Sequence, residues 1–283
     1  MILRSSPRRA LVALVVCLLA PRAAHAQFSY DVPYVPTPHV VVEEMLRLAD
    51  VGPNDFVIDL GSGDGRILIA AASKFGARGV GADLDPERIA ESVANAQAAG
   101  VTDRVAFHRR DLFQFEIGQA TVVTMYLLPS VNLKLRPRLL RELKPGTRIV
   151  SHDFDMEDWQ PDQKSTVRKN VFLWIVPAQV DGRWRTTLAL PAGERAYEIE
   201  IRQKFQEIDG LARYGMKVAG LWNAKLKGDR VSFVMVDDSG PVESNLYCEG
   251  RVTGDVIEGV IRRGIGSGQT QIKWRASRVA AAS

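Results

Sequence analysis

The ten residues that decide the fold read Val57-Ile58-Asp59-Leu60-Gly61-Ser62-Gly63-Asp64-Gly65-Arg66. The apolar run Phe56–Leu60 predicts a buried strand, and the glycines after it predict a tight turn that leads into a helix. Glycine permits a positive φ and lets a ligand lie against the backbone, while the start of a helix offers unpaired N–H groups. The stretch therefore predicts a strand, turn and helix that hold a nucleotide-like ligand.

The spacing of the glycines separates two kinds of ligand. A dinucleotide-binding turn needs G-x-G-x-x-G, with the pyrophosphate over the helix N-terminus. This chain has G-x-G-x-G, and Arg66 stands where the third glycine would be. Asp59, at the end of the strand, would repel a pyrophosphate but suits a cationic ligand. A nucleotide-dependent oxidoreductase is therefore the least favoured of three functions, which also include an active transferase and a binding protein without turnover.

Short β-branched runs alternate with longer amphipathic runs from Phe56 to about Leu190, which is the βαβ pattern. Strands are predicted at Phe56–Leu60, Arg78–Ala82, Val105–His108, Thr121–Tyr126 and Arg148–Asp153. Phe172–Val176 and Trp184–Leu190 are predicted as a closing antiparallel pair. The expected fold class is α/β, with a doubly wound, mainly parallel seven-strand (Rossmann-like) sheet and helices on both faces.

The pattern changes near Pro191. Hairpin turns follow at intervals of about a dozen residues, which is typical of an antiparallel β-meander or small barrel. They are Lys227-Gly228-Asp229, Asp238-Ser239-Gly240, Thr253-Gly254-Asp255 and Gly266-Ser267-Gly268. We predict a first domain over residues 27–190 and an antiparallel all-β domain, of unknown role, over residues 191–283.

The first 26 residues have the order of a signal peptide. Arg4, Arg8 and Arg9 precede the apolar run Ala10 to Ala20, and Ala24-His25-Ala26 supplies a small-x-small cleavage site. We predict a mature chain that starts at Gln27 and a periplasmic or secreted location. The apolar run is about half the length that spans a bilayer, so no stable membrane anchor is predicted.

Composition excludes several classes of protein and ligand. Hydrophobic residues make up 46% and charged residues 25% of the chain, as in ordinary globular proteins. The 37 basic residues exceed the 33 acidic ones only through four arginines in residues 1–26, so 33 face 33 in the mature chain and no nucleic-acid partner is indicated. Cys248 is the only cysteine after Cys17 is removed, so neither an intrachain disulfide nor a cysteine metal cluster is predicted, and we predict no metal.

Asp59-Leu60-Gly61-Ser62-Gly63-Asp64-Gly65 resembles the first motif of the class I S-adenosylmethionine-dependent methyltransferases, whose cofactor carries an ammonium and a sulfonium. Asp83, after the second strand, matches the acid that binds the ribose hydroxyls, and Asp111-Leu112, after the third, matches the pair that meets the adenine. The resemblance implies S-adenosylmethionine as cofactor. The implied binding residues are Asp59, Leu60, Gly61, Ser62, Gly63, Gly65, Asp83, Leu84, Asp111 and Leu112.

A narrower resemblance starts upstream. The run Val32-Pro33-Tyr34-Val35-Pro36-Thr37-Pro38, then a helix, is similar to the small protein-lysine methyltransferases of mitochondrial membrane proteins and their bacterial relatives. It implies that the proline-tyrosine segment lies over the cofactor, that Tyr126–Pro129 borders the acceptor pocket, and that the acceptor is a protein lysine. The export signal and the appended β-domain depart from that family. An exported methyltransferase-like binding protein without turnover is the alternative.

The sequence assigns no catalytic residue. Methyl transfer is a direct displacement, in which alignment of donor and acceptor supplies much of the rate. His152 and Asp153, at the end of the fifth strand, could remove a proton, but a buried histidine with satisfied hydrogen bonds is the commoner outcome. Tyr34, Thr37 and Tyr126 each have an alternative as surface or core packing.

Overall fold

The computed structural model describes residues 34–166, 169–191, 193–237, 244–264 and 269–279. The predicted signal peptide and the start of the proline-tyrosine segment lie outside these residues. So do the predicted turns at Asp238-Ser239-Gly240 and Gly266-Ser267-Gly268.

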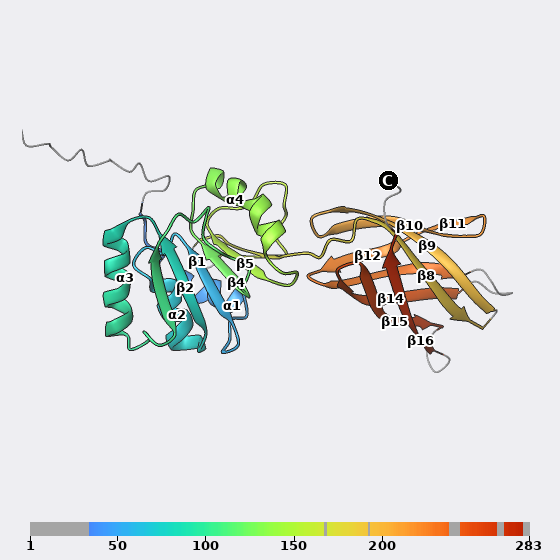
Figure 1. The fold of residues 1–283 in the computed structure, drawn as a ribbon, viewed down its shortest axis with the longest axis horizontal. Helices are drawn as coiled ribbons and strands as arrows, with labels where there is room; N and C mark the ends of the chain where they lie inside the picture. The colour runs from blue at the N-terminus through green and yellow to red at the C-terminus, as the bar shows by residue number, and fades with distance from the viewer. Residues whose placement is uncertain (1–33, 167–168, 192, 238–243, 265–268, 280–283) are drawn as a thin grey trace, which may run out of the picture. The chain divides into compact units, whose positions relative to one another are not determined.

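The first sheet follows the glycine-rich stretch (Figure 1). Its strand order within the described residues is β3-β2-β1-β4-β5-β7-β6, with β1 to β5 parallel and β7 and β6 antiparallel. The strands are β1 Phe56–Leu60, β2 Arg78–Asp83, β3 Val105–Arg109, β4 Val122–Met125, β5 Arg148–His152, β6 Gln163–Ser165 and β7 Val171–Ile175. The mainly parallel, seven-stranded sheet of the predicted fold class is therefore confirmed.

Helices cover both faces of this sheet. They are α1 His39–Leu48, α2 Arg66–Phe75, α3 Pro86–Ala98 and α4 Pro129–Glu142. Side chains alternate along β1, so Val57 packs in a core with α1, α2 and α3, whereas Ile58 and Leu60 pack in a second core with α4. This two-layer packing fixes the strand ends from which the site is built.

Local signals place the ends of these helices. Asp85 precedes α3 and its carboxylate accepts a hydrogen bond from the Glu87 N–H at 2.8 Å, while Pro86 is the first helical residue. Gly76 follows α2 with a φ of 73°, a conformation that favours glycine at a helix end. The expected N-cap and helix stop are therefore present.

The second sheet is antiparallel, with the order β11-β10-β9-β8-β16-β15-β14-β13-β12 within the described residues. Its strands are β8 Gly182–Leu190, β9 Gly193–Lys204, β10 Glu207–Tyr214, β11 Lys217–Gly220, β12 Trp222–Lys227, β13 Arg230–Asp237, β14 Ser244–Thr253, β15 Val256–Arg263 and β16 Thr270–Arg278. One apolar core that includes Trp184, Phe233 and Trp274 lines its inner face. The strands β10 and β12, far apart in this order, contact one another, so the sheet curls as a small barrel does.

One predicted pairing is wrong. Trp184–Leu190 does not pair with Phe172–Val176; as part of β8 it pairs with β9 and β16, and the seventh strand of the first sheet is the short β6. Buried and exposed residues alternate along β8, which suits a sheet with one wet face, whereas β7 is buried along most of its length. The chain therefore changes sheets between Ile175 and Gly182 rather than at residue 191.

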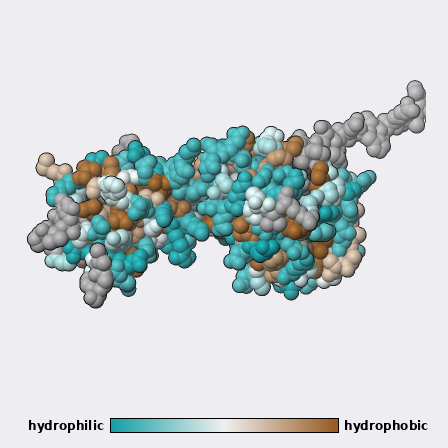
Figure 2. Space-filling view, turned by 180° about the vertical axis from the view of Figure 1, so that it is seen from behind, coloured by the Kyte–Doolittle hydropathy of each residue, from teal (hydrophilic) through white to brown (hydrophobic). Residues whose placement is uncertain are grey.

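The described helices are also short. None of them has the length and apolar character needed to cross a membrane. On the face of the molecule shown in Figure 2, hydrophobic residues are interspersed among hydrophilic ones.

Candidate functional site

The carboxyl ends of the parallel strands meet along one edge of the first sheet. Leu60 of β1 lies opposite Met125 of β4, which lies opposite Ser151 of β5. The residues that follow, Gly61, Tyr126 and His152, therefore continue the same edge. Asp83 ends β2 and Asp111 follows β3, so the residues predicted as a site are brought together at the place where sheets of this class bind ligands.

The glycine turn has the backbone that its sequence predicts. Gly61, Gly63 and Gly65 have φ angles of 80°, 51° and 81°. A Cβ added to Gly61 would lie 2.9 Å from the Leu127 side chain, and one added to Gly63 would lie 2.6 Å from the Tyr34 ring. The turn is therefore closely covered, and only glycine fits it without displacing a neighbour.

Asp83 holds this turn with its carboxylate. One oxygen accepts a hydrogen bond from the Gly63 N–H at 2.9 Å, and the other accepts one from the Asp85 N–H at 3.0 Å. Each oxygen of an ionised carboxylate has a further lone pair to offer. Asp83 is therefore fixed in place and can still accept hydrogen bonds from a pair of ligand hydroxyls. Leu84, beside it, is 38% exposed.

Asp59 is buried at the end of β1. The Thr124 hydroxyl donates a hydrogen bond to its carboxylate at 2.7 Å. Burial raises the pKa of Asp59 to about 7 although this hydrogen bond lowers it, and the negative charges of Asp83 and Asp64 raise it further. Three acids thus concentrate negative potential around the turn, which favours a cationic ligand.

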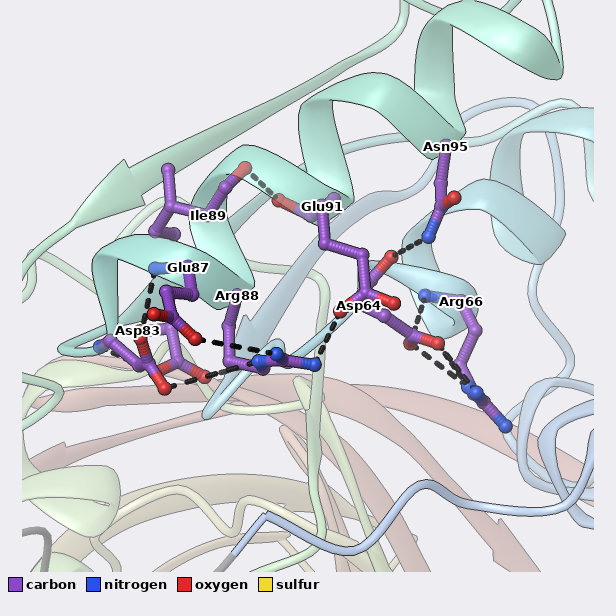
Figure 3. A network of polar contacts seen from close by, with 11 residues as sticks. Asp64, Arg66, Asp83, Glu87, Arg88, Ile89, Glu91 and Asn95 are labelled. Atoms are coloured by element: carbon purple, nitrogen blue, oxygen red, sulfur yellow. Dashed lines mark hydrogen bonds and ion pairs between the residues drawn. The ribbon is translucent and has the colours of Figure 1, made fainter.

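Asp64 and Arg66 form an ion pair at the start of α2 (Figure 3). The Arg66 Nε donates to both Asp64 oxygens, at 2.9 and 3.0 Å. Burial alone would raise the Asp64 pKa, but the hydrogen bonds from the Arg66 side chain and N–H hold it below its usual range. Asn95 of α3 donates to the Asp64 carbonyl at 3.0 Å (Figure 3). Arg66 therefore neutralises one of the acids and leaves Asp59 and Asp83 facing the edge without an ion pair of that kind.

Residues 34–38, which we call the arm, lie against the glycine turn. The Tyr34 ring covers Gly63, and the Arg88 guanidinium carbon lies 4.6 Å from the centre of that ring. The Arg66 Nη1 donates to the Thr37 carbonyl at 3.0 Å. In the sequence Arg66 is only a departure from a dinucleotide motif. In the fold it fastens the arm to the turn, and no local pattern signals a contact between residues so far apart in the chain.

Asp111 and Leu112 follow β3. The Asp111 carboxylate accepts from the Phe113 N–H at 2.9 Å and from the Gln114 side chain at 3.3 Å. Leu112 packs against the core on the α4 side, and Ser62 is buried within the glycine turn. Together with the residues above, the predicted set occupies the loops after β1, β2 and β3.

His152 ends β5 and is only 2% exposed. Its Nδ1 lies 3.1 Å from the Thr37 hydroxyl, and its ring centre lies 3.9 Å from that of Tyr126. The arm, β4 and β5 therefore meet at this histidine. The strand-end position of His152 is readable in the sequence, but its contact with Thr37 is not.

The cover over the glycine turn can be tested with a matched pair of glycines. Gly100→Ala, at a φ of 67° with open space around it, should lower the free energy of unfolding by about 1 kcal/mol. Gly63→Ala should cost about 1 kcal/mol more, because its Cβ must displace the Tyr34 ring. Urea unfolding of both variants measures this difference. In a Tyr34→Ala background the extra cost should disappear; equal costs of the two single variants would place Tyr34 away from the turn.

Comparison with known proteins supplies the chemical context. Residues 59–163 match the family model described as the ANTKMT methyltransferase domain. A "Protein-lysine N-methyltransferase" of Saccharolobus islandicus is 46% identical over 151 residues, which cover 51% of this chain and 94% of that protein. The matched region includes the glycine turn and the loops after β2 and β3.

Mammalian relatives match over a smaller share of their length. The "Adenine nucleotide translocase lysine N-methyltransferase" of Mus musculus is 36% identical, over 51% of this chain and 62% of its own. A Homo sapiens protein, named as a lysine N-methyltransferase of the ATP synthase, is 34% identical, over 46% of this chain and 55% of its own.

One solved structure is similar in both sequence and fold. It is described as an RNA methyltransferase from Salinibacter ruber in complex with S-adenosyl-L-homocysteine. It is 54% identical with a TM-score of 0.51, and covers 52% of this chain and 96% of its own.

Proposed function

Because the chain belongs to the class I S-adenosylmethionine-dependent methyltransferases, in the family of protein-lysine methyltransferases, we propose that its methyl acceptor is a lysine side chain of a protein. The chain is a methyltransferase and S-adenosylmethionine is its cofactor. The acceptor and the residues that bind the cofactor are the proposal.

The residues of the strand edge fit this cofactor. Gly61, Gly63 and Gly65 keep side chains out of the turn, so a ligand can approach the backbone there. The fixed carboxylate of Asp83 suits the two ribose hydroxyls, and the Asp111-Leu112 turn suits the adenine. Asp59 is the buried acid that complements the ammonium and the sulfonium. The bound cofactor supplies a methyl group that its sulfonium makes electrophilic; the protein aligns the acceptor with it.

One observation carries the choice of a lysine acceptor: the acidic character of the strand edge. Asp59, Asp83 and Asp111 all end strands or follow them at this edge. A lysine ammonium is attracted to such a potential, whereas the phosphates of RNA are repelled by it. The balance of 33 basic and 33 acidic residues over residues 27–283 gives a polyanion no compensating attraction.

An RNA acceptor is the second candidate, because the Salinibacter ruber structure is described as an RNA methyltransferase. The two candidates differ in the group that gains the methyl, so one assay separates them.

We expect residues 27–283, supplied with S-adenosylmethionine, to methylate lysine in a protein. Purified ATP synthase and purified adenine nucleotide translocase are the first acceptors to try, since relatives are named for them. Mass spectrometry of peptides should find the mass of one or more methyl groups on lysine. The same acceptors with acetylated lysines should gain none, and a total RNA sample should gain none. Methyl groups in RNA alone would contradict the proposal.

We also propose that the chain is exported and cut after Ala26. The support is the order of a basic segment, an apolar run and Ala24-His25-Ala26, all of it outside the described residues. Mass spectrometry of the native protein should find Gln27 as its first residue. A native protein that retains residues 1–26 would contradict export.

A further inference from the structure

We propose that His152 positions the acceptor: its Nε2 accepts a hydrogen bond from the amine that is to be methylated. This inference rests on the proposed function, because it needs an acceptor with an N–H group. It concerns a part of the strand edge that the cofactor residues do not occupy, the end of β5.

The first observation is that one nitrogen of this buried ring has a partner and the other has none. Nδ1 meets the Thr37 hydroxyl at 3.1 Å, whereas Nε2 is buried without a hydrogen-bond partner among the described residues. Buried polar atoms of side chains nearly always have partners, and an unsatisfied one destabilises the fold. A partner from outside the chain accounts for Nε2.

The second observation is where the ring lies. His152 follows Ser151, which is two strands away from Leu60 at the start of the glycine turn. Neighbouring strands are about 4.8 Å apart, so the end of β5 lies about 10 Å from that turn, at a distance suited to an acceptor beside the cofactor. Tyr126, at the end of the strand between them, lies against the ring and limits its rotation.

The third observation is the set of groups around the ring. Nε2 can accept a hydrogen bond only in the tautomer whose Nδ1–H donates to the Thr37 hydroxyl. Burial lowers the pKa of His152, Asp153 raises it and Lys169 lowers it, so the net direction is downward and the imidazole is neutral at pH 7. Thr37 and the Tyr126 phenol ring are the other groups that contact it. An amine normally titrates near pH 10.4, so a histidine of lowered pKa orients the amine rather than keeps its proton.

Two substitutions at this position separate the two ring nitrogens. Asn places an amide where Nδ1 stands and keeps a contact with Thr37; Gln places one where Nε2 stands. We expect His152→Asn to lower kcat about 100-fold, since small errors of alignment have effects of this size. His152→Gln should stay within about tenfold of the wild type. His39→Gln, on the exposed start of α1, is the control and should keep full activity. All three should bind S-adenosylmethionine with wild-type affinity in calorimetry.

Thr37 gives a second test through the tautomer. Thr37→Val should lower kcat and Thr37→Ser should restore it, with kcat/KM falling at acid pH as His152 gains a proton below its ordinary pKa of 6.5. Asn and Gln variants of equal activity, or an Asn variant that is the more active, would overturn the proposal in favour of a structural role.

A readout without turnover separates this proposal from the function on which it rests. n-Butylamine, a mimic of the lysine side chain, is titrated into the protein saturated with S-adenosylhomocysteine. We expect a saturable change in the ¹⁵N shift of the His152 Nε2, and none at His39. If no protein lysine is methylated but this shift occurs, the proposed function fails and the role of His152 as an amine acceptor stands. An unchanged Nε2 shift would overturn that role whatever the activity.

Discussion

Asp83→Ala should raise the dissociation constant for S-adenosylmethionine by about 10- to 150-fold, the equivalent of about 1.5–3 kcal/mol. The substitution removes the carboxylate that we assign to the ribose hydroxyls. It also frees the Gly63 N–H and the Asp85 N–H, which Asp83 holds at 2.9 and 3.0 Å. Both losses act on the same ligand, since the Gly63 bond keeps the turn in its shape.

Isothermal titration of S-adenosylmethionine into the wild type and the variant measures the effect. Asp103→Ala is the matched control, because Asp103 is an exposed acid in the loop between α3 and β3 and should leave the affinity unchanged. Equal affinities of the Asp83 variant and the wild type would remove Asp83 from the cofactor site.

Asp59→Asn should abolish a loss of stability that the ligand-free wild type shows as the pH rises to about 7. Burial raises the pKa of Asp59 from its ordinary 3.8 to about 7. The folded chain therefore binds this proton more tightly than the unfolded chain does. The resulting stabilisation is fully present below about pH 4 and is lost as the pH rises through about 7, by roughly 4 kcal/mol in total. Asn stays neutral and still accepts from Thr124.

Urea unfolding between about pH 5 and 8 tests this. Over that range the wild type should lose about 2–3 kcal/mol relative to the Asn variant. Asp103→Asn, at the exposed control position, should follow the wild type. Parallel pH profiles of the wild type and Asp59→Asn would show that the Asp59 carboxyl is already ionised in the folded chain at acid pH.

Much of the first sheet could be predicted because its signals are local. The strand Phe56–Leu60 is found at its predicted bounds, and the other parallel strands differ by a residue or two at their ends. The glycine turn needs positive φ angles that glycine adopts readily, and the acids that we assign to the cofactor follow directly from strand ends. Order along the chain is enough to place these residues at one edge, since parallel strands share their carboxyl ends.

Long-range pairings could not be predicted in the same way. β8 lies beside β16, which pairs Thr186 with Ala276, and nothing near Thr186 in the chain encodes that partner. The contacts of Thr37 with His152 and with Arg66 likewise join separate parts of the chain. A practical consequence is that a fragment ending at residue 192 would carry β8 without β9 and β16, so a first-domain fragment should end before Gly182. Independent folding of that fragment stays a prediction.

The central claim is that the glycine turn and the acids beside it form a site for a cationic nucleoside, and direct titration tests it. Calorimetry of residues 27–283 with S-adenosylmethionine, and separately with NAD, compares the two classes of ligand that a glycine-rich turn can hold. We predict saturable, one-to-one binding of S-adenosylmethionine that weakens in Asp83→Ala, and no binding of NAD. Binding of NAD, or binding of S-adenosylmethionine that is unaffected by changes at both Asp59 and Asp83, would contradict the assignment of this site.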